Sequence, residues 1–242
     1  MELQFNSTIN EGLYLKNPQS TTVGKAIIRE SILMMADLGN EHFTFKKLAS
    51  RINTTEATVY RYFENKHLLL LYVINLYWLL IEFQIIFYTQ NLKDDKSKIN
   101  RIIQILMESA EGKLKYEGID VAALYRIIIT EGNKVYMTKS VKEDNDKQFF
   151  KAYKDLCNTI AEIFKSYNAK YKYHHSLAST LIEMAHLQHF FAENLPRLTD
   201  KKGTVKLRPD QKISIVREWD DASVRVKAVR GFLVELAGVA GK

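Results

Sequence analysis

The longest apolar stretch in this chain of 242 residues is LLLLYVINLYWLLIEFQIIFY, from Leu68 to Tyr88. As a helix, this stretch would be about 31 Å long, enough to cross the hydrocarbon core of a membrane. However, Asn75, Glu82 and Gln84 interrupt it, and a charged side chain near the centre of a bilayer costs about 2.5–3.5 kcal/mol. Neither flank carries the one-sided cluster of Lys and Arg that orients a membrane helix. We therefore favour a long helix buried on most sides over a membrane span.

Helical periodicity also dominates the rest of the chain. Only three prolines and ten glycines interrupt it, and strand patterns are scarce. The sequence therefore predicts an all-α fold of about nine helices, with enough residues for one core or for a small domain joined to a larger one. The expected helices are Thr22–Leu38, Thr44–Arg51, Thr55–Phe63, a long one from Lys66, Lys96–Leu114, one capped by Asp120, Asn145–Tyr167, Tyr173–Asn194 and Ala222–Ala240.

Two short predicted helices come directly before the apolar stretch. Thr44 is a suitable N-cap for the first and Thr55 for the second, because a threonine hydroxyl accepts a hydrogen bond from a free amide of the first turn. Asn53 lies between them, and asparagine tolerates the left-handed conformation of a tight turn. This spacing is typical of a helix-turn-helix, a DNA-binding motif. The side chains expected to pack inward are Leu48, Ala49, Ile52, Val59 and Phe63.

The segment FTFKKLASRINTTEATVYRYFENKHLLL resembles the TetR (tetracycline-repressor-type) family of transcriptional regulators. The likeness extends from Thr22 to Leu71 without a gap. Asn53 replaces the usual glycine of the family's turn, and Thr54 replaces an apolar residue, but neither breaks the motif. The resemblance implies a DNA-binding domain at residues 20–66, followed by a helical ligand-binding and dimerisation domain at residues 67–242. The matching residues are Leu48, Ala49, Thr55, Thr58, Val59, Tyr60, Tyr62, Phe63, Lys66 and Leu68–Leu71.

The resemblance also implies which residues contact a double-stranded DNA operator. Arg61 is expected on a base or on a phosphate at the groove edge, and Glu56 can accept a hydrogen bond from a cytosine amino group. Hydroxyl groups, lysines and helix N-termini can position DNA without a large net charge. Residues expected on phosphates are Thr44, Lys46, Tyr60, Tyr62 and Lys66, and residues expected to face the major groove are Thr55, Glu56, Ala57 and Thr58.

The formal net charge of +7 fits a nucleic-acid-binding protein but does not locate the binding surface. Residues 1–70, which contain the motif, hold 8 basic and 7 acidic side chains, and residues 71–196 hold 16 and 15. Residues 197–242 hold 11 and 6, so the excess positive charge lies in the C-terminal tail. This tail also lacks Asn and Tyr, and we expect residues 205–242 to differ from the rest in origin or role.

By the same resemblance, the protein is expected to act as a homodimeric repressor. Two copies would read two half-sites of a symmetric operator about one DNA turn apart, with Tyr173–Asn194 and the last helix forming the dimer contact. A small, hydrophobic effector would tilt the helix that begins at Lys66 and release the DNA. The candidate pocket residues are Trp78, Phe83, Phe87, Tyr125 and Phe149, although the same aromatic side chains also suit a simple core.

No catalytic site is recognisable in the sequence, and we expect neither an enzyme nor a cofactor. There is no Gly-rich phosphate loop, no GxSxG and no HExxH motif. Glu183, His186 and His189 are three residues apart, so the first and last drift apart on a helix face, and we expect no metal site there. The alternative function is a helical protein-interaction or membrane-associated module without effector-controlled DNA binding.

Two features favour a cytoplasmic protein. The start of the chain, MELQFNSTINEG, lacks the basic and apolar regions of a signal peptide. The single cysteine, Cys157, excludes a disulfide within the chain and fits a reducing compartment. Before the first predicted helix, we expect residues 1–19 to form a flexible N-terminal arm.

Overall fold

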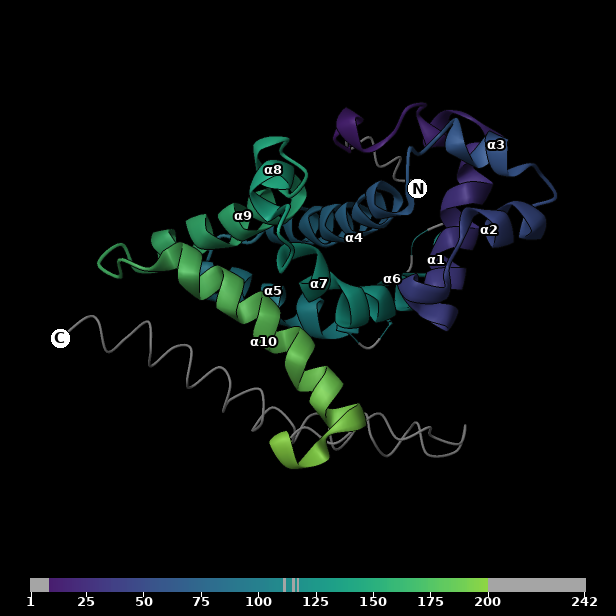
Figure 1. Cartoon of the computed structure of the whole chain (residues 1–242). Coiled ribbons are helices and arrows are strands. Elements are labelled where there is room, and N and C mark those ends of the chain that lie inside the picture. Colours follow the sequence, from purple (N-terminus) through teal and green to yellow (C-terminus); the bar gives the residue numbers. More distant parts are fainter. Residues whose placement is uncertain (1–8, 111, 115, 117, 200–242) are drawn as a thin grey trace.

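Helices make up the fold in the part of the chain that the computed structural model describes, residues 9–199 except 111, 115 and 117 (Figure 1). In this part, extended backbone pairs only in an isolated bridge between Tyr116 and Ile119. The predicted all-α fold is therefore confirmed. The α-helices are α1 (Thr22–His42), α2 (Phe45–Arg51), α3 (Glu56–Tyr60), α4 (Lys66–Thr89), α5 (Asp95–Ala110), α6 (Val121–Ile127), α7 (Asn133–Tyr136), α8 (Val141–Asp146), α9 (Lys151–Tyr167) and α10 (His174–Asn194). Shorter turns are the 3-10 helices η1 (Glu11–Leu13), η2 (Pro18–Ser20) and η4 (Pro196–Leu198) and the π-helical η3 (Ile128–Gly132).

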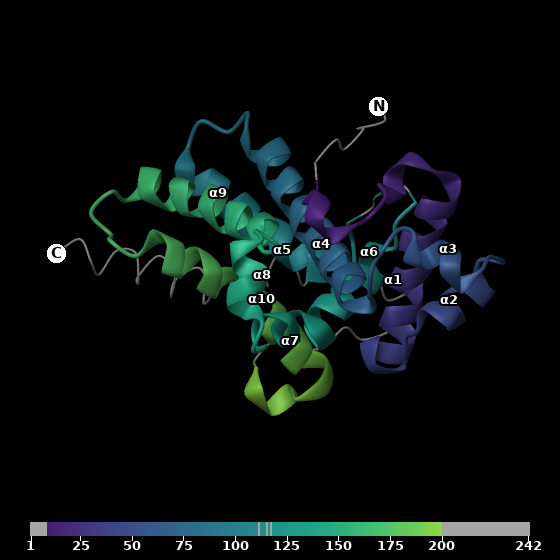
Figure 2. The ribbon, with the colours of Figure 1, turned by 45° about the horizontal axis from the view of Figure 1, so that its top comes forward.

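The helices α1, α2 and α3 lie together at one end of the molecule (Figures 1 and 2). Leu48 of α2, Val59 of α3 and Phe63 behind α3 are fully buried, as the inward positions of the motif predict. Asn53 has a positive φ of 52°, so it makes the tight turn between α2 and α3. The helix-turn-helix predicted from the sequence is therefore confirmed.

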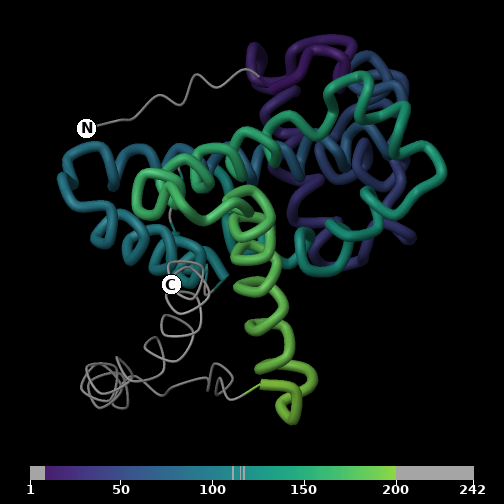
Figure 3. Tube along the Cα trace, turned by 90° about the vertical axis from the view of Figure 1, so that its left-hand side faces the viewer, coloured from purple at the N-terminus to yellow at the C-terminus, as the bar shows by residue number. Residues whose placement is uncertain are grey.

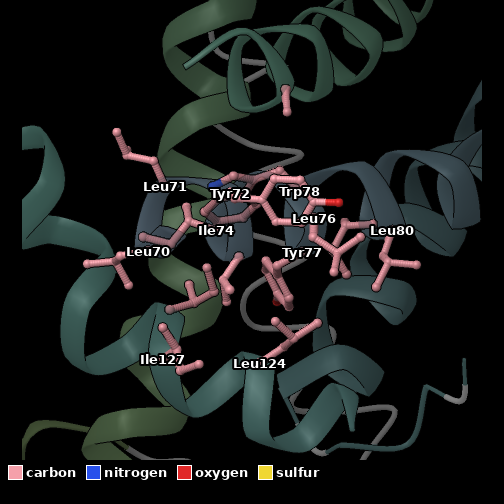
Figure 4. Packing of buried hydrophobic residues seen from close by; sticks show 14 of the residues in the cluster. Leu70, Leu71, Tyr72, Ile74, Leu76, Tyr77, Trp78, Leu80, Leu124 and Ile127 are labelled. Atoms are coloured by element: carbon pink, nitrogen blue, oxygen red, sulfur yellow. The ribbon is translucent and has the colours of Figure 1, made fainter. Parts of the chain in front are cut away.

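The long helix α4 passes from the end that holds α1, α2 and α3 through the centre of the protein. Asn65 caps its first turn by accepting a hydrogen bond from the Leu68 amide at 2.9 Å. Its N-terminal half is buried on nearly all sides, and Figure 4 shows side chains such as Tyr77 packed near Leu124 and Ile127 of α6. By length and composition alone, α4 could span a membrane. However, 72% of the apolar 18-residue segment on which this assessment rests is buried within the protein. The prediction of a buried helix over a membrane span is confirmed.

The polar groups within the apolar stretch have partners inside the protein. The buried Asn75 amide donates to the Leu71 and Phe149 carbonyls, each at 2.8 Å. Glu82 accepts a hydrogen bond from the Thr159 hydroxyl of α9 at 2.8 Å. These bonds offset the cost of removing the polar groups from water.

The helices α5, α6, α9 and α10 surround α4 (Figure 1). α9 and α10 lie side by side, joined by a short connection, and α10 extends beyond the helices around α4 (Figure 3). The single helix predicted for Asn145–Tyr167 is wrong. The structure divides it into α8 and α9, because Gln148 has a positive φ of 60° between them.

The N-terminal arm corrects a second expectation. Where the structure describes it, the arm is packed against the protein rather than flexible, with Leu13 fully buried and Ile9 nearly so. The sequence did not indicate this packing, because only two isolated apolar side chains of a mostly polar segment make the contacts, and two side chains form no periodic pattern. The final predicted helix, Ala222–Ala240, and the atypical tail, residues 205–242, lie outside the described residues.

Candidate DNA-binding surface

The N-termini of α2 and α3 are capped by the threonines that the sequence indicated. Thr44 Oγ1 accepts a hydrogen bond from the Lys47 amide, and Thr55 Oγ1 accepts one from the Thr58 amide, both at 3.2 Å. α3 contains five residues, of which only Val59 is buried. The short helix therefore presents most of its side chains to the outside, as a recognition helix must.

Three polar side chains on α3 and its flanks form one hydrogen-bonded row. The hydroxyl groups of Thr55 and Thr58 lie 2.9 Å apart, and Arg61 Nη2 donates to Thr58 Oγ1 at 3.2 Å. Thr55 and Arg61 are exposed and Thr58 is half-buried. The row holds the Arg61 guanidinium beside α3, and Glu56 and Ala57 are exposed on the same helix.

Tyr60 packs its ring against α2 and stays about half exposed. The ring meets Phe45 of α2 edge-on at 4.9 Å between centroids, while 48% of Tyr60 remains exposed. Phe45 itself is buried, as expected of a core residue. The contact holds one face of Tyr60 against α2 and leaves about half of the residue exposed, which is compatible with a phosphate contact.

Tyr62 departs from its expected role on a phosphate. Only 4% of this residue is exposed, and its hydroxyl lies 2.7 Å from Thr21 Oγ1. The backbone turns inward after α3, since the amides of Tyr62 and Phe63 both donate to the Val59 carbonyl. In this conformation Tyr62 joins the start of α1 to the end of α3. Of the two tyrosines, Tyr60 is the exposed one.

The predicted lysine contacts lie on the same end of the protein and are exposed. Lys46 is in the first turn of α2, and Lys66 is the first residue of α4. Lys66 Nζ donates to the Asn40 carbonyl at 3.1 Å, and Lys47 Nζ donates to the His42 carbonyl at 2.9 Å. Both ammonium groups therefore lie near the C-terminal end of α1, where they add positive charge beside two helix N-termini.

A carboxylate links two arginines between α1 and α2. Glu30 accepts hydrogen bonds from Arg29 Nε at 3.0 Å and from Arg51 Nε at 2.7 Å. Burial acts to raise the pKa of Glu30, but the hydrogen bonds and charges of Arg51 and Arg29 outweigh it and lower the pKa. Glu30 therefore stays ionised at neutral pH and offsets part of the positive charge on this side.

The sequence reasoning missed the contribution of the N-terminal segment to this surface. The Leu15 amide donates to the Tyr62 carbonyl at 2.8 Å, and Lys16 Nζ lies 5.3 Å from the centroid of the Tyr62 ring. These contacts join residues more than forty positions apart in the chain. No local pattern in the sequence indicates them, because each depends on how the arm folds back.

Residues 27–73 match the family of bacterial regulatory proteins described as the tetR family. These residues contain most of α1, all of the helix-turn-helix and the start of α4. These residues therefore form a DNA-binding domain of the tetR type. No curated protein matches it.

Solved structures share the fold of this chain at low sequence identity. AibR in complex with isovaleryl coenzyme A and operator DNA is 16% identical, with a TM-score of 0.50, over 67% of this chain and 83% of that one. Apo AibR is also 16% identical, with a TM-score of 0.51, over 77% and 91%. The superantigen PfiT is 11% identical, with a TM-score of 0.55, over 76% and 90%. At these identities the likenesses show the fold.

The five aromatic residues predicted to line an effector pocket do not converge on one point of the protein. Trp78 and Tyr125 are buried and both contact the His186 ring, at 5.5 and 5.6 Å between centroids. Phe149 is buried beside the N-terminal segment, and Phe83 stacks on Phe87 at 6.0 Å in the later part of α4. Only the first two are therefore candidates for one site.

His186 connects the buried aromatic groups through hydrogen bonds. The Tyr77 hydroxyl lies 3.0 Å from His186 Nε2 and 2.7 Å from the Ser109 hydroxyl, and the Tyr125 hydroxyl donates to the His186 carbonyl at 3.4 Å. Burial, with the neighbouring His189, lowers the pKa of His186 to about 3. The ring is therefore neutral at physiological pH, and the network joins α4, α5, α6 and α10.

Glu183 and the nearby His174, which lie in the same stretch of the sequence as His186, have separate partners. His174 Nε2 lies 3.1 Å from the Asn168 carbonyl, and Glu183 accepts a hydrogen bond from the Tyr153 hydroxyl at 2.7 Å. Among the residues that the structure describes, no three His, Cys, Asp or Glu side chains are grouped to hold a metal ion.

A surface groove of about 350 Å³ runs along one face of α10. None of the predicted effector residues lines it. The lining residues are Ser179, Thr180, Glu183, Met184, Leu187, Gln188 and Phe191.

Proposed function

We propose that this regulator is a repressor that binds a two-fold symmetric DNA operator as a homodimer. The observation that carries the proposal is the capped, exposed helix α3, with the Thr55, Thr58 and Arg61 row and the exposed Tyr60. A single α3 reaches only a few base pairs, so two copies related by a two-fold axis give the site its length. The proposal places the protein in the cytoplasm, where it has access to DNA.

A small, hydrophobic molecule is the proposed effector. The structure of AibR was determined with isovaleryl coenzyme A and operator DNA, which supports an apolar acyl group as one chemical type to test here. Trp78 and Tyr125 are the proposed contact residues, because they meet at His186 beside α4. Binding next to Tyr77 and Trp78 would move α4, whose first residue, Lys66, lies on the DNA-binding end.

Footprinting on the DNA upstream of the protein's own gene tests the proposal. We expect a protected site with two half-sites related by two-fold symmetry. A folded protein that protects no DNA at low salt would contradict it. The alternative, a membrane-associated module, is disfavoured by the burial of α4.

Substituting contact residues separates specific contacts from charge alone. The double variant Tyr60→Phe with Lys66→Ala should bind all sequences more weakly and with a shallower dependence on salt. Fewer counterions leave the DNA on binding when a lysine–phosphate contact is missing. The matched control is Tyr167→Phe with Lys139→Ala, whose side chains are exposed in the helical domain. Equal salt slopes for the two variants would exclude Lys66 as a phosphate contact, and equal affinities would also exclude Tyr60.

A further inference from the structure

Residues 9–20 form a strap that connects the helical domain to the DNA-binding end. The strap contains η1 and η2 and passes along the first turns of α4, from the side of α8 towards α1 and α3 (Figures 1 and 2). Leu13, in its middle, is fully buried. The strap therefore touches both parts of the molecule that an effector signal must connect.

One end of the strap is fixed by the side chain of Asn10. Its Nδ2 donates to the Lys147 carbonyl at 2.9 Å and to the Gln148 carbonyl at 3.1 Å. Its Oδ1 accepts a hydrogen bond from the Gly12 amide at 2.8 Å. Both amide hydrogens and the amide oxygen of Asn10 are therefore engaged, and the side chain has one defined orientation.

The carbonyls that Asn10 holds belong to the joint between α8 and α9. This joint needs support, because a left-handed φ at Gln148 is unfavourable for a residue with a side chain, and the carbonyls of Lys147 and Gln148 lie beyond the last residue of α8. Asn75 of α4 donates to the next carbonyl, that of Phe149. Two asparagine amides, one from the strap and one from α4, therefore bind three consecutive carbonyls of the joint.

A second close contact between the strap and the joint is that of Gly12 with Phe149. A Cβ atom added at Gly12 would lie 3.1 Å from Cε1 of Phe149. α8 is also tied to the first turn of α4, since His67 Nε2 lies 3.3 Å from Asp144 Oδ2. The joint thus contacts both elements that lead to the DNA-binding end.

The other end of the strap is attached directly behind the recognition helix. The Leu15 amide donates to the Tyr62 carbonyl at 2.8 Å, and Tyr62 follows α3 by two residues. Gln19 Nε2 donates to the Tyr72 hydroxyl of α4 at 3.1 Å. Only residues 11–14 separate Asn10 from Leu15, and Leu13 among them is buried. The two attachment points of the strap can therefore move little relative to each other.

We propose that Asn10 is a positioning residue for operator binding, which fixes the end of α3 through the strap and ties its position to the α8–α9 joint. The inference rests on the proposed function. Asn10 itself lies at the joint and acts on the recognition helix through Leu15 and Tyr62. Movement of the joint on effector binding thus reaches α3 through the strap as well as through α4, because the strap is attached at both ends.

The test compares Asn10→Ala with Asn17→Ala. Both residues cap a 3-10 turn of the same strap, Asn10 for η1 and Asn17 for η2, by accepting an amide hydrogen bond. Only Asn10 also bonds to the joint. We expect the operator dissociation constant to rise about fivefold or more for Asn10→Ala, the lower end of typical coupling between sites, and to change less than about twofold for Asn17→Ala.

Amide hydrogen exchange gives a readout that does not depend on DNA. Asn10→Ala should speed exchange at the Leu15 amide, which bonds to Tyr62, and at the amides of Tyr62 and Phe63, while Asn17→Ala leaves the last two unchanged. Gly12→Ala is a second variant, whose added Cβ would lie 3.1 Å from both Asn10 Oδ1 and Phe149 Cε1, so it crowds the Asn10 amide and the contact of the strap with Phe149. It should weaken operator binding in the same direction.

The outcomes separate this inference from the proposed function. If the wild type binds its operator and both Asn10→Ala and Gly12→Ala bind as tightly, the positioning role is wrong and the proposed function stands. If the wild type binds no DNA, the proposed function fails, and the inference fails with it. Faster exchange at Tyr62 and Phe63 together with weaker operator binding, in Asn10→Ala but not in Asn17→Ala, supports the inference.

Discussion

Tyr60 and Tyr62 are two residues apart, yet their hydroxyl groups have different surroundings. Tyr60 leans on Phe45 and is 48% exposed, whereas Tyr62 is 4% exposed and hydrogen-bonded to Thr21. In the sequence the two tyrosines look equivalent. Their roles separate because the chain leaves the helical path after Tyr60 and the next turn folds Tyr62 inward.

Removing one hydroxyl at a time should separate binding from stability. Tyr60→Phe should raise the operator dissociation constant about tenfold with little change in the free energy of unfolding, because a hydrogen bond to a charged phosphate is lost. Tyr62→Phe should lower the free energy of unfolding by about 1 kcal/mol, because the hydrogen bond between the Tyr62 and Thr21 hydroxyl groups is lost. Urea unfolding and operator titration of both variants measure the two effects. A Tyr62→Phe variant that is fully stable but binds weakly would restore Tyr62 as a phosphate contact.

At the scale of elements, the network around His186 joins four helices that follow the helix-turn-helix in the chain. Tyr77 belongs to α4, Ser109 to α5, Tyr125 to α6 and His186 to α10. Burial raises the pKa of Tyr77 and Tyr125, so both hydroxyl groups stay protonated as donors. A buried network of this kind stabilises the fold only while each member remains neutral and paired.

The low pKa of His186 predicts a loss of stability in mild acid. The unfolded chain binds a proton at His186 near its ordinary pKa of 6.5, whereas the folded protein does so only near 3. Stability from this group is therefore complete above pH 6.5 and falls as the pH drops through that value, by about 2 kcal/mol at pH 5. Urea unfolding at pH 7 and pH 5 should show that His186→Gln removes this part of the pH dependence. His175→Gln, at an exposed position of the same helix, should retain it.

Elements whose ends depend on local groups were predictable from the sequence. α2, α3 and α4 begin beside Thr44, Thr55 and Asn65, because each cap bonds to an amide three residues later. The break between α8 and α9 was not predictable, since Asn10 and Asn75 support it from distant parts of the chain. A local pattern cannot show a bond of that kind.

The candidate site residues also differ in whether local sequence patterns could predict them. The exposed positions on α2 and α3 follow from the motif, because helical spacing decides which side chains point outward. The predicted effector residues were chosen for aromatic character alone, and the structure separates Phe83, Phe87 and Phe149 from Trp78 and Tyr125. Aromatic residues identify a core but do not specify which of its parts opens to a ligand.

At the scale of the whole molecule, α10 carries a stripe of side chains that is partly exposed in the structure of residues 9–199. Thr180, Met184, Leu187 and Phe191 follow one another at intervals of four, three and four residues, and all line the surface groove. This spacing is that of a helix that pairs with another helix. A second copy of α10 would cover the stripe, which supports the proposed homodimer.

Leu187→Glu should convert the proposed dimer into a folded monomer. Leu187 is 39% exposed in the single chain, so a carboxylate there costs little in the monomer but places two like charges in a desolvated interface of the dimer. Operator binding should weaken by about a hundredfold, because one half-site no longer assists the other. Sedimentation and operator titration measure the two effects, and Lys139→Glu, at an exposed position outside α10, should change neither. A Leu187→Glu protein that remains dimeric would show that the two copies meet through another face, and the groove on α10 would then need a different occupant.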